Sequence, residues 1–559
     1  MKQPELYQFS AVTVIFLLAF FYLGTLLISF FIKKDKEDAD AYMVSNQNVG
    51  FGLSATSMTA TWIWAASFYA AATSGYTYGL SGPLHYGLWG ALMILFIYPF
   101  GRRIRSLAPQ AHTLGEVIHA RHGSSSQLIL AFSNVLGSLI SLMVNFTAAG
   151  ALVAVLSPLS FQTGVIIAGL GVLSYTIWSG FRASVLTDVV QLSAMMLVAI
   201  VIIPLVLYAM GGPQALVAGI DNLTPEQANF FSKEAILQQG APYFVAVLAY
   251  AIGNQTISQR LFAVRQDMIK PTFITATVGY GAIVIGLGMI GLLAAMAGIE
   301  PLGGDTNNLI PQVISTYLSP VMVAAFFILV IGSLSSTADS DLSALSAIMM
   351  TDLYGKNLAK DRPNPRTMLF IGRLTMIVAT TAGIVMASLA LDILVMLVFV
   401  GGLWGAIVFP VIASMYWRRV NNAAFTWAVV AGLALFTVAR FELLDMSGVT
   451  GLFFETIASI GGGVVLGLMT FGFFGKRPGI VVGVIAGVAL GYYGIGFLRD
   501  YPVLLASLTA YGASTVTCVA LSLRNREEFD FRLIRQRVGN FDDGSETDDH
   551  YAGAAAARS

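Results

Sequence analysis

One apolar stretch of the chain carries more oxygen-bearing side chains than a lipid-facing helix needs. Between residues 317 and 352 the sequence contains Ser333, Ser336, Thr337, Ser340 and Asp341. At about 100° per residue, these side chains fall on one face of a single helix, with the carboxylate at the edge of that face. We call the four hydroxyl residues the hydroxyl stripe. Asp339 points elsewhere on the same helix and is expected to serve packing or gating.

Hydroxyl and carbonyl oxygens bind hard cations, which sulfur and imidazole do not suit. Close packing of small residues is a simpler explanation for such a stripe. It does not explain two carboxylates in the same span, because each costs at least ~2.5–3.5 kcal/mol at the centre of a membrane helix. The residues therefore predict a Na⁺ site that includes Ser333, Ser336 and Thr337.

The composition indicates that these residues lie in an integral membrane protein. Of 559 residues, 56% are hydrophobic and 11% are charged, whereas a soluble protein carries roughly 25% charged residues. The 30 basic and 30 acidic residues balance, which gives no sign of nucleic-acid binding. The single cysteine, Cys518, excludes a disulfide framework and a Cys-based metal site.

Apolar runs long enough to cross a bilayer need about 20 residues. Fifteen such spans are expected, near 8–32, 49–75, 80–106, 127–156, 161–180, 183–211, 240–262, 271–298, 317–352, 366–390, 392–416, 422–440, 453–474, 478–498 and 502–523. Lys and Arg cluster in every second loop, and basic loops stay cytoplasmic. The expected topology in the plasma (inner) membrane thus has the N-terminus outside and the C-terminus in the cytoplasm. An odd number of spans is consistent with it.

Two spans five helices apart look interrupted. Span 49–75 is rich in small and hydroxyl residues, and span 240–262 contains Gly253, Asn254 and Gln255 at depth. Broken helices survive in a membrane only where protein or a water-filled cavity satisfies the backbone. Two blocks of five helices, each led by a broken one, predict an all-α transporter core made of two inverted repeats, with ligands bound at the breaks.

The expected organisation has five parts. They are an N-terminal extra helix and loop at 1–48, the first repeat at 49–211, the second repeat at 240–418, accessory helices at 419–523, and a cytoplasmic tail at 524–559 with a helix and disorder.

Other polar and aromatic residues are weaker candidates. Asp188 is either an interfacial residue near a helix start or a carboxylate that supports the site or a second ion. Trp62, Trp64, Tyr69 and Tyr250 are candidate pocket walls, although aromatic residues also gather at membrane interfaces. Glu116, His119 and His122 are spaced for one helix face, and a structural role is expected because no distant ligand completes a metal site.

The stretch SLSSTADSDLSALSAIMMTDLY resembles the eighth core helix of the sodium:solute symporter family. The resemblance implies that Na⁺ is bound by the hydroxyls of Ser336 and Thr337 and the carbonyls of Trp62, Ala65 and Ser333. It also matches Asp188 to an aspartate on the sodium path or at a second sodium, and Tyr250 to an inner gate. The segments TWIWAASFYAAATSGYTYGLSGPLHYG and IRSLAPQAHTLGEVIHARHG are similar to the urea active transporter branch. Asp188 and GNQTISQR depart from that branch.

These features predict a Na⁺-coupled symporter, not an enzyme, that imports a small polar solute by alternating access, with urea as the leading cargo. Asp188, Ser340 and Asp341 are expected around the ion, and Trp64, Tyr69, Tyr250 and Asn254 around the solute. No cofactor, nucleic acid or oligomeric partner is required. The alternatives are H⁺ coupling through Asp341 or Asp188, Na⁺-driven transport of monocarboxylates, amino acids or polyamines, and a channel-like pore.

Overall fold

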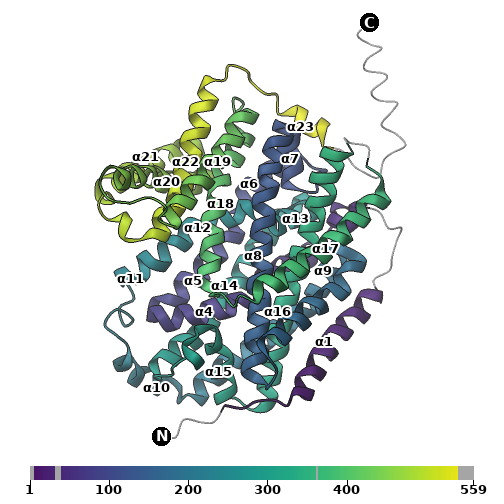
Figure 1. Ribbon diagram of the computed structural model, residues 1–559, viewed down its shortest axis with the longest axis vertical. Coiled ribbons are helices and arrows are strands. Elements are labelled where there is room, and N and C mark those ends of the chain that lie inside the picture. The colour runs from purple at the N-terminus through teal and green to yellow at the C-terminus, as the bar shows by residue number, and fades with distance from the viewer. Residues whose placement is uncertain (1–5, 32–38, 360–362, 539–559) are drawn as a thin grey trace.

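The computed structural model describes residues 6–31, 39–359 and 363–538, which are overwhelmingly helical (Figure 1). Within these ranges the one β-bridge is the isolated pair Val49 and Val264, so this part of the chain has no sheet. Five of the basic residues used for topology (Lys33, Lys34, Lys36, Lys360 and Arg362) and the acidic end of the tail lie outside the described residues.

The described chain contains 13 segments long and apolar enough to cross a membrane. The expected number was fifteen, and two features explain the difference. One 43-residue segment, Ala65–Leu107, counts once although it contains half of a broken helix and the whole next span. Helix α21 (Lys476–Tyr493) is not among the 13 because it begins with Lys476 and Arg477 and ends in two tyrosines.

The remaining long helices match the expected spans. They are α1 (Ala11–Phe31), α5 (Gly82–Leu95), α6 (Ile97–Leu107), α8 (Ser124–Leu156), α9 (Phe161–Ala209), α14 (Ile269–Met296), α16 (Pro320–Ala347), α17 (Pro365–Ala387), α18 (Ile393–Tyr416), α19 (Asn422–Arg440), α20 (Gly448–Phe474) and α22 (Pro502–Arg524). Two expected spans form the single element α9, which changes direction at Gly180, where φ is 54°. Only glycine adopts that conformation at little cost.

Both predicted breaks are present. The first broken helix consists of α3 (Phe51–Trp62) and α4 (Ala65–Tyr78). The second broken helix consists of α12 (Ala241–Gly253) and α13 (Gln255–Ala263). At the second break Asn254 is extended, and its Oδ1 accepts from the Thr256 amide at 2.8 Å. A helix start needs such a cap because its first amides have no partner within the helix.

Helix α16 occupies the centre of the bundle and packs against α3, α8, α9 and α17. Residues 329–348 are all buried, so the hydroxyl stripe faces protein and not lipid. Short helices mark the two ends of the molecule. Helices α10 (Gly212–Gly219) and α15 (Leu309–Tyr317) lie at one end, and α7 (Leu114–His122) and α23 (Arg532–Arg537) lie at the other (Figure 1). We call these the α10 end and the α23 end.

Candidate functional site

The hydroxyl stripe lies directly against the first broken helix. Ser336 Oγ donates to the Ala60 carbonyl at 2.9 Å, and Thr337 Oγ1 donates to the Thr61 carbonyl at 3.0 Å. Both hydroxyls also lie near the Ser333 carbonyl, at 3.1 and 3.3 Å. Five oxygens from α3 and α16 therefore meet at one buried point.

The break explains why these carbonyls are available. Helix α3 stops at Trp62, so its last carbonyls lack the amide partners that a continuing helix would supply. Ser333 Oγ donates to the Ile63 carbonyl at the break itself. The carbonyls of Ala60, Thr61 and Ile63 thus face the stripe. The Trp62 carbonyl accepts instead from the Trp64 amide at 3.0 Å.

Ala65, the other carbonyl donor implied by resemblance, begins α4 and is fully buried. Its assignment and that of Trp62 as Na⁺ ligands stay predictions. The two residues flank the break that faces the stripe, one turn or less from the carbonyls in contact with it.

Ser340 joins the stripe to a buried ion pair. It donates to the Ser336 carbonyl at 2.6 Å and accepts from Arg260 Nη2 at 2.7 Å. The same guanidinium lies 3.2 Å from Asp188 Oδ2, with side chains 3% and 0% exposed. Ser57 of α3 donates to that carboxylate oxygen at 2.6 Å. Asp188 is therefore no interfacial residue, because it is buried and paired with a cation from the second broken helix.

The two carboxylates of α16 face different helices, as their spacing predicts. Asp339 accepts from Ser184 Oγ at 2.6 Å and from Tyr175 OH at 2.8 Å, both on α9. Asp341 accepts from Ser141 Oγ of α8 at 2.5 Å. Asp339 therefore joins the polar network around Arg260, whereas Asp341 lies on the α8 side of the stripe.

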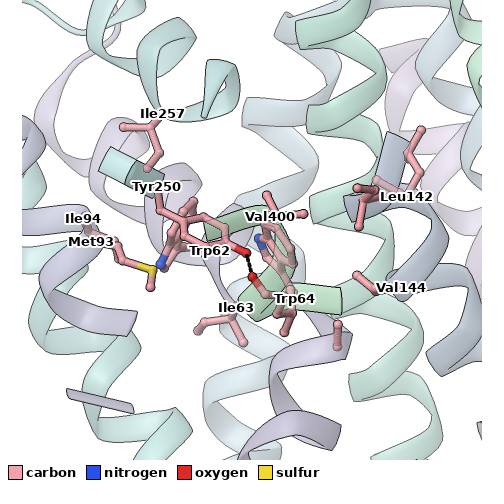
Figure 2. Packing of buried hydrophobic residues seen from close by; sticks show 14 of the residues in the cluster. Trp62, Ile63, Trp64, Met93, Ile94, Leu142, Val144, Tyr250, Ile257 and Val400 are labelled. Atoms are coloured by element: carbon pink, nitrogen blue, oxygen red, sulfur yellow. Dashed lines mark hydrogen bonds between the residues drawn. The ribbon is translucent and has the colours of Figure 1, made fainter. Parts of the chain in front are cut away.

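Aromatic rings from both broken helices pack together beside this site (Figure 2), and they line a small pocket. Ring centroids of Trp62 and Trp64 are 5.8 Å apart, and Tyr250 lies 5.9 and 6.3 Å from them. Tyr250 OH donates to the Leu397 carbonyl of α18 at 2.7 Å. The pocket has a volume of about 20 Å³, roughly the room needed for one water molecule.

Two expected pocket residues lie elsewhere. Tyr69 OH donates to the Ala148 carbonyl on α8 at 2.9 Å. Asn254 caps α13 with its side chain. Neither lines the small pocket.

Several lining residues were not anticipated from the sequence. Ser67, Tyr86, Tyr243 and Tyr280 also line the pocket. No local pattern distinguishes these residues from other aromatic and hydroxyl residues of the spans. Arg260 did leave a signal, because it is a charged residue inside the predicted span 240–262.

Two histidines near α7 are hydrogen-bonded within the protein. His112 Nδ1 lies 3.1 Å from Glu116 Oε2, and His122 Nε2 lies 2.7 Å from Ser414 Oγ. Burial and the neighbouring Arg121 lower the pKa of His122 well below its ordinary value, so this imidazole is neutral at pH 7. The described residues hold no group of three acidic, His or Cys side chains suited to a metal ion.

Comparisons with known proteins agree with this architecture. Residues 42–432 match the model of the sodium:solute symporter family. The chain is 25% identical to the sodium/pantothenate symporter of Escherichia coli, over 71% of the chain and 83% of that protein. It is 24% identical to the probable urea active transporter 1 of Schizosaccharomyces pombe, over 78% of the chain and 70% of that protein. Identity to the high-affinity proline transporter of Bacillus subtilis is also 24%, over 73% and 87%.

A solved structure shares the fold. The substrate-bound, outward-open structure of a Na⁺-coupled sialic acid symporter superposes with a TM-score of 0.65 at 17% identity, and it covers 85% of this chain and 98% of that one. The expected transporter fold is thereby confirmed, whereas relatives with three different cargoes match at similar identity. Because the family model spans most of its length, this chain belongs to the sodium:solute symporter family and is a Na⁺-coupled membrane transporter, not an enzyme.

Proposed function

We propose that this protein imports a small, uncharged polar solute of the urea type, and that the driving Na⁺ binds between α3 and α16. One observation carries the ion site: Ser336 and Thr337 hydroxyls meet the Ala60 and Thr61 carbonyls at 2.9 and 3.0 Å. Neutral oxygens of this kind suit Na⁺. The Ser333 carbonyl and the carbonyls of Trp62 and Ala65 are the remaining proposed donors.

The position of the ion explains how it would drive transport. An ion held by both helices ties α3 to α16, and a ligand shifts a conformational equilibrium by its differential affinity for the two states. One charge moving through the membrane contributes ~2.3 kcal/mol per 100 mV. That corresponds to about forty-fold accumulation, so one Na⁺ per solute is sufficient for uptake against a gradient.

The pocket supports an uncharged cargo. None of its ten lining residues carries a charge, so a carboxylate or a polyamine would be desolvated without an ion partner. A lining of aromatic side chains with a few polar residues suits a small amide. At about 20 Å³ the pocket must widen to admit even urea, which fits alternation between open and closed states.

Uptake into proteoliposomes tests the proposal. Radiolabelled urea, acetate, proline and putrescine are compared with an inward Na⁺ gradient, with a pH gradient alone, and with neither. We expect urea to accumulate only with Na⁺. Accumulation driven by the pH gradient alone would establish a proton symporter, and equilibration without either gradient would establish a pore.

The ion site is tested by Thr337→Ala, which removes one of the proposed ligands. The apparent affinity for Na⁺ should fall by about tenfold or more, because hydrogen-bond-type contacts to a charge contribute roughly 1.5–3 kcal/mol. Thr337→Ser keeps the hydroxyl and should retain the affinity. Ser335→Ala is the matched control, since its buried hydroxyl lies on the same helix, α16, but beside Tyr22 of α1 and not against the first broken helix. An unchanged Na⁺ dependence in Thr337→Ala contradicts the assignment.

A further inference from the structure

A second and larger cavity lies towards the α10 end of the molecule. It has a volume of about 260 Å³ and is walled by the end of α4, the turn before α12, the start of α18, and the facing ends of α19 and α22. We call it the outer cavity. Its volume approaches the roughly 300 Å³ at which ligand pockets begin, so it has room for a small solute.

The outer cavity is the neighbour of the aromatic pocket along α18. Val395, Val398 and Phe399 line the outer cavity, and Leu397 between them lines the pocket. Leu397 lies on the opposite face of α18 from Val395, so the helix itself stands between the two spaces. Tyr78 of the outer cavity ends α4, which carries Ser67 of the pocket further along, and Gln239 precedes α12, which carries Tyr243 and Tyr250 of the pocket. The outer cavity thus lies at the ends of α4 and α12, and the pocket lies deeper along the same two helices.

The lining carries groups of both signs together with neutral polar groups. Arg440 ends α19 and Asp500 precedes α22, and the Gln238 amide and the Tyr501 ring complete this rim. Two opposite charges on one site give a ligand of either net charge little net attraction, because the attraction of one group is offset by the repulsion of the other. A net-neutral solute with both donors and acceptors can use both.

Part of this wall is specific to the chain's C-terminal helices. The family model ends at residue 432, whereas Arg440 and residues 500–504 lie beyond it. The part of the chain matched by the family model thus supplies the α18 side of the lining. The accessory helices supply its two charged residues, Arg440 and Asp500.

We propose that the outer cavity is a reception site that binds small net-neutral, dipolar solutes before the Na⁺-dependent step, with Arg440 and Asp500 as specificity-determining residues. The inference rests on the proposed import of an uncharged solute and adds a second binding site for that solute. Binding here does not involve the hydroxyl stripe, so it requires no Na⁺.

Cysteine protection tests the site directly. The only native cysteine, Cys518, is buried, and Cys518→Ser gives a clean background for Val395→Cys, whose native side chain is 44% exposed in the cavity. The rate of labelling by a small methanethiosulfonate reagent is measured on the full-length protein in Na⁺-free liposomes. The probes are urea, proline, acetate and methylammonium. Leu443→Cys, 61% exposed on the loop after α19 and outside the cavity, is the control.

We expect urea or proline to slow labelling at position 395 without Na⁺, and neither to slow it at position 443. Protection by acetate or methylammonium, or by none of the four probes, overturns the proposal. If protection is found while Na⁺-driven urea uptake fails, the cavity assignment stands and the proposed function falls. If Na⁺-driven urea uptake is found without protection, the proposed function stands and the cavity assignment falls.

Transport kinetics separate a specificity role from a structural one. Arg440→Gln and Asp500→Asn should each raise the apparent KM for urea about three- to tenfold, the equivalent of a net hydrogen bond, while kcat and the Na⁺ affinity stay unchanged. Arg440→Lys keeps the charge and should restore most of the KM. A fall in kcat with unchanged KM in the Gln and Asn variants overturns the specificity role.

Discussion

At the scale of single residues, the buried pair of Asp188 and Arg260 connects the two broken helices. Arg260 comes from α13, and its Nε lies 3.0 Å from Ser57 Oγ of α3. Ser340 places the same guanidinium next to the ion site. A pair so deeply buried does little to raise stability, but loss of one partner leaves a charge without compensation.

Arg260→Gln should therefore lower the free energy of unfolding by roughly 3–5 kcal/mol, because Asp188 stays buried and unpaired. The double variant Arg260→Gln with Asp188→Asn should recover much of that loss. Denaturation of the purified protein in detergent measures both.

Arg366→Gln is the matched control, since Arg366 is exposed at the start of α17. Its effect should stay within about 0.5 kcal/mol. If Arg260→Gln and Arg366→Gln change the free energy of unfolding by the same amount, loss of one partner of the buried pair does not destabilise the protein as proposed.

At the scale of elements, α4 and α14 pack with their backbones in contact. A Cβ on Gly291 would overlap the Ala72 carbonyl, and a Cβ on Gly75 would overlap the Gly288 carbonyl. Glycines allow membrane helices to approach this closely. The contact positions α4, which carries Ser67 of the aromatic pocket.

Gly291→Ala should cost about 1–3 kcal/mol, because the two helices must separate to admit the methyl group. Gly24→Ala on α1 has no neighbour within 4 Å and should be neutral. Thermal unfolding compares the two variants. Equal melting temperatures would show that the α4–α14 contact can yield at little cost.

At the scale of the whole molecule, the two ends differ in which chain segments and basic residues they contain. Residues Tyr7 and Phe9 bond to Ser315 and Leu156 near α15, whereas α23 packs against α6 and α7 at the other end. Arg103 and Arg418 contact Phe531 and Glu528, in the segment just before α23. Basic residues therefore gather at the α23 end, which is expected to face the cytoplasm.

Protease-cleavable tags at the two termini test this topology in intact cells. Protease in the medium should remove the N-terminal tag, and the C-terminal tag should be cleaved only after lysis. The converse pattern would reverse the orientation. Cleavage of both tags from one side would mean an even number of crossings.

The sequence by itself determined the membrane location, the positions of both helix breaks and the face of α16 that carries the hydroxyl stripe. These properties depend on local composition and on the 3.6-residue repeat of one helix. Tertiary structure decided what each face meets: the carbonyls of Ala60 and Thr61 at the stripe, Arg260 at Asp188, and Tyr86 and Tyr243 at the pocket. Such partners depend on how each helix is rotated and shifted against its neighbours. That arrangement arises from packing between segments far apart in the chain, which no local pattern encodes.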